Sequence, residues 1–588
     1  MIKKISQLSP WWWLAAYVLI NLIQSYASPI DADEAYYWMY AHHLDWGYFD
    51  HPPMVALLIS LGMDWLPGSL GLRFGHVLTG GLTMLVAWDL LGRPSGKNAW
   101  VIALLLAALP MLQVYGFIAT PDGPLLLFSA LLLWGLKKFL HAPTYQNGLV
   151  IAFIMAALLY SKYHGVLFIL FCIIPILPWL IRQPAAWMAV LVGSLLYLPH
   201  LYWQYAHDYP SFRYHLSGRN DPYQFKYTTE YLLNQLVIFN PFLLYYFVKS
   251  LIRKAPAEDH TLPNQRFYTA CRWLVFLSLG FFLYSTSKGG TEAQWTAMIS
   301  IPLIYVLHEG LIANPHWHKN LLRIGYLSLA LFTIARLALM APREWLPFKK
   351  PFDAAPWVAE LEEEANGLPL IFENSYRDPS HYRFYTGEKP AWTFTDVNYR
   401  PNQYDIWAGD TAFHNQKVLV VGKGNWQIAG GRPFTSQGKK LVLKEIDNFQ
   451  VAKFAKLKLQ DSLPETLTAG QVIQFDVLAD LNFNVATSEE KSNAFANQTL
   501  NLDAELPLQL FAIFQYVGDG WQYYPLEPLT RKSIDVKENQ LLYSGEFTVP
   551  ADLPATELIF QLGMGYQGMP PLRGQSELIP VTLKAPEN

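Results

Sequence analysis

The chain has very few cysteines and few charged residues. Its 588 residues include only Cys172 and Cys271, and 15% are Asp, Glu, Lys or Arg. Two cysteines cannot form a disulfide framework or a multi-thiolate metal site, and here both lie in or beside apolar runs. Soluble domains contain about 25% charged residues, so one large soluble protein is excluded. The net charge of −3 excludes a nucleic-acid role that rests on bulk positive charge.

Apolar residues are concentrated in the first part of the chain. A spanning helix needs about 20 mainly apolar residues. We therefore predict a polytopic α-helical membrane domain over 1–340, with spans near 11–27, 74–91, 99–118, 123–140, 148–160, 165–181, 186–204, 231–250, 273–286, 296–312 and 321–340. The first span could instead be a signal peptide, but ten spans follow it, and its Trp cluster is typical of an interfacial anchor.

The loop charges give the orientation. With the N-terminus in the cytoplasm, the inner loops hold thirteen Lys and Arg residues and the outer loops of the membrane domain hold six. Eleven spans then place residues 341–588 outside, which for a bacterial inner membrane means the periplasmic side. Within this region we predict an α/β subdomain over 341–440 and a β-sandwich-like domain over 441–588, from strand-like runs separated by turn residues.

The polar clusters that interrupt the apolar runs all fall on the outer side. The first outer loop contains DADE and DHPP, and the later outer loops contain TPDG, SKYHG, HDYPSFRYHLSGR and SKGGTEAQW. The inner loops contain only basic connectors. This distribution places the chemistry on the extracytoplasmic face.

Three carboxylates are candidate catalytic groups. Asp33 and Glu34 follow the first span, where a carboxylate can act as a general base or merely mark the membrane boundary. Asp122 begins an apolar helix after Pro121, so helix capping alone would explain it, but it lies on the same face as the first-loop acids. The aromatic and polar neighbours that we expect to bind sugar or acceptor are Tyr36, Tyr37, Tyr163, Glu292 and Trp295.

Lys162 lies between two apolar runs that leave no room for a loop. A charge at membrane depth costs about 2.5 to 3.5 kcal/mol on insertion scales, so such a residue is a functional candidate unless it snorkels to the interface. With Arg213, Arg219 and Lys288 it would form a cationic pocket suited to phosphate. Asp50 with an outer histidine could hold a divalent ion, but the histidines have no fixed metal-ligand spacing.

Acidic and cationic groups at a membrane surface suit one reaction class. Positive charge stabilises a lipid-linked phosphate leaving group, and a carboxylate orients or deprotonates an acceptor hydroxyl. The rivals are a flippase or transporter of lipid-linked saccharide and a non-catalytic assembly protein. The first predicts charges at the bilayer midplane and internal repeats, which the sequence does not show; the second leaves the one-sided acids and lysine unexplained.

The motifs together resemble a known family. DADEAYY, YFDHPPMVALL, TPDGPLLLF, SKYHG, HDYPSFRYHLSGR and QYDIW are similar, in order over residues 10 to about 410, to the bacterial dolichyl-phosphate-mannose protein mannosyltransferase-like glycosyltransferases of the GT-C superfamily. The resemblance implies transfer of a sugar, with inversion, from a polyprenyl-phosphate donor to a lipid, glycan or protein acceptor. It implies no nucleic-acid partner and no certain cofactor, although a divalent metal occurs in a relative.

The resemblance also implies roles for residues. Asp33 matches the principal catalytic acid with Glu34 beside it, Asp122 matches a second acid, and Lys162 falls where the family has a lysine near the lipid phosphate. Asp50 and His51 stand where the aminoarabinose transferase of lipid A has Glu and Lys, an acid at a metal site and a phosphate-binding lysine. His215 corresponds loosely to the histidine of that metal site. This chain therefore departs from its relative at the metal position, and His51 replaces the lysine at the phosphate contact.

Overall fold

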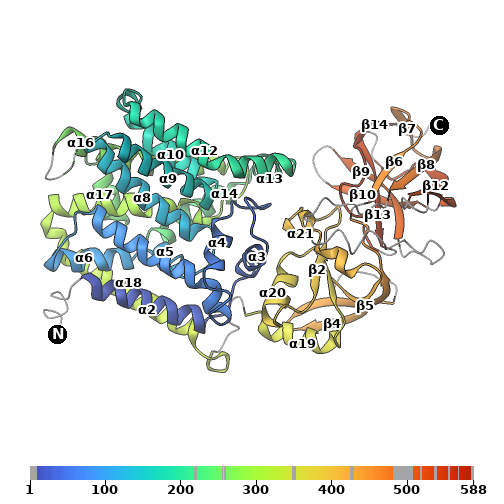
Figure 1. Cartoon of the computed structure of the whole chain (residues 1–588), viewed down its shortest axis with the longest axis horizontal. Coiled ribbons are helices and arrows are strands. Elements are labelled where there is room, and N and C mark those ends of the chain that lie inside the picture. Colours follow the sequence, from blue (N-terminus) through green and yellow to red (C-terminus); the bar gives the residue numbers. More distant parts are fainter. Residues whose placement is uncertain are drawn as a thin grey trace. The chain divides into compact units, whose positions relative to one another are not determined.

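The chain folds into two units, each with its own core. The structure is a computed structural model, and it describes residues 10–217, 222–254, 256, 260–346, 353–423, 430–453, 455–480, 508–516, 520–526, 528–535, 540–553, 556–566 and 569–584. The units are Met1–Asp353, which is helical, and Ala354–Asn588, which contains all the described strands (Figure 1). The unit boundary therefore lies thirteen residues after the predicted boundary at 340.

Six of the described helical segments are long and apolar enough to cross a membrane. They are α5 (Gly68–Leu90), α8 (Asp122–His141), α12 (Pro184–Ala206), α16 (Leu262–Ser285), η2 with α17 (Ala293–Ala313) and η3 with α18 (Pro315–Met340). Shorter apolar helices cover Asn98–Ala107, Tyr145–Ser161 (α9) and His164–Leu180. These helices coincide with predicted spans, so the polytopic α-helical class is confirmed.

Three of the predicted spans are interrupted. The span at 99–118 is divided into α6 (Gly96–Ala107) and α7 (Pro110–Val114), and the span at 231–250 into α14 (Phe225–Ile238) and α15 (Leu244–Leu251). The span at 165–181 is divided into α10 (His164–Ile173), η1 (Ile174–Ile176) and α11 (Leu177–Leu180). Pro110, Pro175 and Pro178 lie at two of these breaks, and Asn240, with a φ of 62°, lies at the third before Pro241. Proline removes a helical N–H donor, so the helical hydrogen-bond pattern changes at these positions, although 164–180 stays one continuous helical segment.

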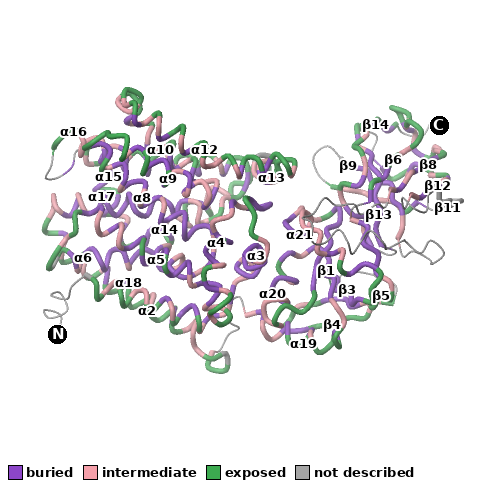
Figure 2. The backbone as a smooth tube through the Cα atoms, viewed as in Figure 1, coloured by how far each residue is buried: buried purple, intermediate pink, exposed green. Residues whose placement is uncertain are grey.

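The helices of the first unit differ in how deeply they lie in it. In α8 and in the η2–α17 segment, 72% and 78% of the most apolar window is buried, against 22% and 17% for α12 and the η3–α18 segment (Figure 2). Helix α2 (Pro10–Ala27) packs against α5, and its Tyr17 hydroxyl donates to the carbonyl of Leu112 at 2.7 Å. This helix is thus an integrated part of the bundle, as an anchor would be.

The second unit begins with a mixed sheet. Its strand order is β2-β1-β3-β5-β4, with β1 (Leu370–Glu373) parallel to both β2 (Ala391–Phe394) and β3 (Gln416–Lys423). Strands β5 (Lys439–Phe449) and β4 (Arg432–Ser436) add antiparallel to β3 and to each other. Helices α19 (Ala355–Ala365) and α20 (Arg377–Tyr385) share buried residues with the sheet's core. Because β5 ends at Phe449, this α/β region continues past the predicted limit at 440.

Two further antiparallel-rich sheets follow. One has the order β10-β9-β13-β14-β7 and the other β11-β12-β8-β6. Their bounds are β6 (Lys456–Leu459), β7 (Thr466–Thr468), β8 (Val472–Asp480), β9 (Leu508–Tyr516), β10 (Trp521–Leu526), β11 (Pro528–Asp535), β12 (Gln540–Thr548), β13 (Glu557–Tyr566) and β14 (Ile579–Lys584). Rings from both sheets meet, for example Phe514 of β9 and Phe547 of β12, whose centroids are 6.2 Å apart. The two sheets thus pack face to face, which is the arrangement of a β-sandwich.

Candidate active site

Glu34 lies in a buried ion pair rather than in open solvent. Helix α3 (Ala32–Ala41) begins at a capping box formed by Asp31 and Glu34. The Glu34 carboxylate accepts hydrogen bonds from Arg73 Nε at 2.7 Å and Nη2 at 2.6 Å, and from the backbone N–H groups of Ala119 (2.8 Å) and Asp31 (2.9 Å). Burial would raise the pKa of this carboxyl, but Arg73 and the two backbone donors lower it below its ordinary value. Glu34 is therefore ionised and its oxygens are occupied.

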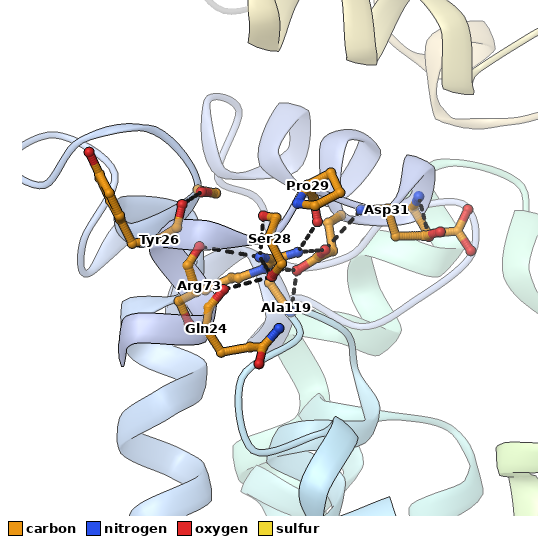
Figure 3. A network of polar contacts seen from close by, with 11 residues as sticks. Gln24, Tyr26, Ser28, Pro29, Asp31, Arg73 and Ala119 are labelled. Atoms are coloured by element: carbon orange, nitrogen blue, oxygen red, sulfur yellow. Dashed lines mark hydrogen bonds and ion pairs between the residues drawn. The ribbon is translucent and has the colours of Figure 1, made fainter. Parts of the chain in front are cut away.

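Arg73 also contacts residues outside its pair with Glu34. Its Nη1 donates to the carbonyls of Ser25 (3.3 Å) and Ser28 (3.0 Å), and its Nη2 donates to the carbonyl of Pro29 (2.8 Å) (Figure 3). The guanidinium also lies over the Phe117 ring at 5.5 Å. The pair therefore ties the end of α2, the start of α3 and helix α5 to the segment that leads into Asp122. It positions two predicted catalytic acids, since Asp33 adjoins Glu34 and Asp122 follows Ala119 by three residues.

Asp33 lies on another face of α3. Residues three, four and seven positions apart share a helix face, so Asp33 shares one with Tyr36, Tyr37 and Tyr40, whereas Glu34 lies about 100° around the helix. Asp33 is half-buried, while the three tyrosines are buried. Their rings form a cluster, with Tyr36 and Tyr40 centroids 4.8 Å apart. Asp33 therefore lies at the more exposed end of the tyrosine-lined face of α3.

Asp50 and His51 pack against the same tyrosines. The Asp50 carboxylate accepts hydrogen bonds from the hydroxyls of Tyr36 at 3.1 Å and Tyr40 at 3.4 Å, and the His51 ring contacts Tyr37 with centroids 5.6 Å apart. His215 Nε2 lies 3.3 Å from the Asp50 backbone carbonyl. Among the described residues no group of three His, Cys, Asp or Glu could hold a metal ion. Within the described part of the chain, Asp50 and His215 therefore have no third His, Cys, Asp or Glu with which to hold a metal ion.

Asp122 and Lys162 form the second buried ion pair. Lys162 follows the last residue of α9 and Asp122 begins α8, so the two helix ends bring them together across 40 residues of sequence. Lys162 Nζ lies 2.8 Å from one Asp122 carboxylate oxygen and 2.9 Å from the other. Both side chains are buried, being 7% and 6% exposed. Glu292, the residue before η2, is near enough to act electrostatically on Asp122.

Tyr163 connects the Asp122–Lys162 pair to the α3 face. It follows Lys162 directly, and its hydroxyl lies 3.1 Å from His200 Nε2 and accepts from Gln204 Nε2 at 3.0 Å. Its ring centroid is 5.4 Å from that of His215, which contacts Asp50. On the other side, the His164 ring lies 5.4 Å from the Trp295 ring. Predicted residues from four loops are therefore brought into one continuous region.

The remaining predicted cations lie elsewhere or outside the described residues. Arg213 pairs with Asp208 at 2.6 Å, and both side chains are largely exposed. Lys288 is also exposed, and Arg219 lies outside the described residues. Of the predicted phosphate-binding cations that the structure describes, Lys162 is thus the buried one.

Two buried arginines were not among the predicted site residues. Arg73 was counted only as a loop charge, and Arg336 lies inside the predicted span at 321–340. Arg336 Nη2 donates to the Gln113 carbonyl at 2.9 Å and to its side-chain oxygen at 3.0 Å, and the guanidinium lies 5.3 Å from the Phe117 ring. The Phe117 ring therefore lies near both guanidinium groups. A charge inside an apolar run was the signal available for Arg336.

Comparison with known proteins identifies the fold and a family segment. Residues 50–203 match the family model of dolichyl-phosphate-mannose-protein mannosyltransferase. The structure of ArnT from Cupriavidus metallidurans in the apo state is similar with a TM-score of 0.54 and 12% identity, covering 74% of this chain and 97% of that chain. ArnT bound to undecaprenyl phosphate gives the same values. Comparison with the curated proteins gives no match.

The match at residues 50–203 contains Asp50, His51, Asp122, Lys162 and Tyr163, so it includes much of the region described above. The ArnT likeness extends over both units and shows a shared polytopic fold. Residues 50–203 of this multi-pass membrane protein are thus similar to the dolichyl-phosphate-mannose-protein mannosyltransferases, and its fold is similar to that of ArnT.

Proposed function

We propose that this protein transfers a sugar from a polyprenyl-phosphate donor to an acceptor on the extracytoplasmic side of the bacterial inner membrane. The observation that carries the proposal is the buried Asp122–Lys162 pair beside the α3 face that bears Asp33. A buried ammonium at a helix end is suited to a phosphate within the membrane boundary. A solved ArnT structure, similar in fold, is described as bound to undecaprenyl phosphate, which supports the lipid carrier.

The bond changes assign a task to each group. The acceptor oxygen forms a bond to the anomeric carbon while the bond from that carbon to the phosphate oxygen breaks, which inverts the anomeric centre. The Asp33 carboxylate takes the proton from the acceptor hydroxyl, and polyprenyl phosphate leaves with the electron pair. Lys162 stabilises the negative charge that develops on this phosphate. Asp122 holds the ammonium in place until the phosphate arrives.

Tyr36, Tyr37 and Tyr163 supply the surface for the sugar. Aromatic faces pack against the C–H groups of a pyranose or furanose ring, and their hydroxyls hydrogen-bond to its oxygens. Trp295 contacts the His164 ring and Glu292 acts electrostatically on Asp122, and we assign these two residues to the acceptor. The acceptor is a lipid, a glycan or a protein, and the described residues favour none of these over the others.

The test uses the full-length protein in sealed vesicles. Undecaprenyl phosphate carrying radiolabelled arabinose, mannose or glucose is supplied with an envelope extract from cells that lack the protein, and transfer of label is followed. We expect transfer with one donor, and a 10²–10⁴-fold lower rate for Asp33→Asn with unchanged binding of undecaprenyl phosphate. Asp208→Asn, an exposed carboxylate in a surface pair, is the matched control.

Equal rates for Asp33→Asn and the wild type would exclude Asp33 as the base. The flippase alternative has a separate outcome in the same vesicles. If labelled lipid-linked sugar moves across the bilayer with its sugar–phosphate bond intact, and no donor supports transfer, the protein is a transporter rather than a transferase.

A further inference from the structure

Arg336 is a buried arginine within the candidate span Pro315–Met340. It lies in α18 (His318–Met340), four residues before the end of this helix, a distance of about 6 Å at 1.5 Å per residue. An arginine so near a helix end can extend to the membrane surface and keep its charge in water. Arg336 is instead only 9% exposed, and its Nη2 donates to the carbonyl and the side-chain oxygen of Gln113. Its charge therefore lies inside the helical unit.

Arg336 has no acidic partner in the part of the chain that the structure describes. No described Asp or Glu forms an ion pair with it, and the group that acts on it electrostatically is the hydroxyl of Tyr17 in α2. The Gln113 carbonyl and the Phe117 ring orient the guanidinium without neutralising it. A buried charge is strongly unfavourable unless an opposite charge compensates it. An anion from outside the chain would supply that charge.

Buried polar atoms near Arg336 are available to hold such an anion. Arg336 Nη1 and the side-chain amides of Asn21 and Gln24 have no hydrogen-bond partner of normal geometry among the described residues. Both amide residues are fully buried. Tyr17, Asn21 and Gln24 are spaced by four and three residues, so they share one face of α2, which packs against α18. Asn21 acts on the same Tyr17 hydroxyl that acts on Arg336, so the two side chains lie close to one ligand position.

These groups fit a small anion. Guanidinium and amide N–H groups are hydrogen-bond donors, so their ligand must be an acceptor, and the charge of Arg336 requires it to be negative. The outward-facing side chains of α18, Leu331, Ile334 and Leu337, are exposed, whereas Arg336 Nη1 is enclosed by protein. An enclosed position favours a monoatomic anion over a phosphate with a lipid attached.

We propose that Arg336 and Asn21 bind a chloride ion inside the helical unit. Arg336 Nη1 and Asn21 Nδ2 would donate to the ion, with Gln24 one turn further along the same face of α2. The ion would join the first and last described helices of this unit that have a polar buried face to the segment at 113–117, because Arg336 also holds Gln113. The site is separate from the donor site, and it stands whether or not the protein is a transferase.

The test measures thermal unfolding of the full-length protein in detergent, in sodium chloride or sodium gluconate at equal ionic strength. We expect the wild-type midpoint to rise by about 2–4 °C, with saturation, as chloride replaces gluconate, because a ligand of the folded state stabilises it. Arg336→Gln, which keeps a donor towards Gln113, should lose this rise. Asn21→Leu should need about ten-fold more chloride for half of the rise. Arg323→Gln, at an exposed arginine of the same helix, should respond as the wild type does.

Wild-type crystals grown in bromide give a second measurement that does not depend on a variant. Bromide replaces chloride, and its anomalous scattering should give a peak within hydrogen-bond distance of Arg336 Nη1. The proposal is overturned if no peak lies there, or if the wild type and Arg336→Gln respond equally to chloride. A midpoint that rises with inorganic phosphate but not with chloride would overturn it too, because the site would then belong to an oxyanion.

Discussion

The buried Glu34–Arg73 and Asp122–Lys162 ion pairs of the first unit are built differently. Glu34 and Arg73 are each bonded to several backbone groups, so that almost every donor and acceptor of the pair has a partner. Asp122 and Lys162 face mainly each other: the lysine directs its ammonium at both carboxylate oxygens, and Glu292 adds a second negative charge nearby. One pair is enclosed by backbone, and the other depends on a single partner.

This difference separates a structural pair from one that can exchange partners. A buried ion pair offsets its desolvation only when further hydrogen bonds satisfy its remaining atoms, as they do for Glu34 and Arg73. Lys162 has three donors and one bidentate partner, so an arriving phosphate can share or replace Asp122 at modest cost. An acid–base pair therefore suits positioning in one case and ligand binding in the other.

The largest effect is expected when the Glu34–Arg73 pair is broken. Arg73→Met leaves a buried carboxylate without its cation, which should lower the free energy of unfolding by about 3–5 kcal/mol. Thermal unfolding in detergent and the yield of monodisperse protein measure this loss. Arg213→Gln, which breaks an exposed pair, should cost less than about 1 kcal/mol. Similar stability of the two variants would show that the enclosed pair is not structural.

A smaller effect on stability, with a clear effect on binding, is expected at Lys162. Lys162→Met should weaken the binding of undecaprenyl phosphate by about 10- to 100-fold, because a charge-assisted hydrogen bond contributes about 1.5–3 kcal/mol. The double variant with Asp122→Asn should recover the stability that Lys162→Met loses, but not the binding. Native mass spectrometry gives the binding, and thermal unfolding gives the stability. Recovery of both would assign Lys162 to structure alone.

The sequence was informative where the chemistry is local. Lys162 and Asp122 could be selected because each is a charge beside an apolar run, and the strands of the second unit follow from alternation and turn residues. The ion pair of Glu34 could not be predicted, because its partner Arg73 lies 39 residues away in another helix. The breaks in three spans were also missed, since apolar content alone does not show where a helix stops.

A further cluster in the second unit was missed for the same reason. Strands β1 and β2 are parallel neighbours, so their carboxyl ends bring Glu373 and Asp396 together across the loop that contains α20. The two carboxyl groups act electrostatically on each other, and Asp396 Oδ1 accepts from the Asn398 N–H at 2.8 Å. Lys423 ends β3 nearby, and its N–H donates to Glu373 at 3.2 Å. No motif in the sequence marks such a pair.

Glu373 and Asp396 differ from the two ion pairs above because both members are carboxyl groups. We expect the smallest effect on stability for this cluster. Burial raises the pKa of Glu373 to about 7 from 4.5, with the Asp396 charge adding to the shift and the Lys423 N–H opposing it. The pKa of Asp396 is also raised, mainly by burial. The Asp396 charge also acts electrostatically on Tyr523, from β10, and on Arg573. The folded state thus keeps a proton that the unfolded chain releases near pH 4.5.

The sign of the pH dependence follows from this difference in proton binding. Because the unfolded state has lost the proton between about pH 4.5 and 7 and the folded state has not, local stability should fall as pH rises through this window and stay level above it. Glu373→Gln keeps a donor towards Asp396 and removes the titration, so it should flatten the profile and be more stable than wild type by about 1–2 kcal/mol at pH 8. Hydrogen exchange of peptides covering β1 and β3, corrected for intrinsic rates, measures this opening. Glu577→Gln, an exposed carboxylate, should follow the wild type; a wild-type profile that rises with pH would show instead that the pair is ionised in the folded state, as Glu34 is.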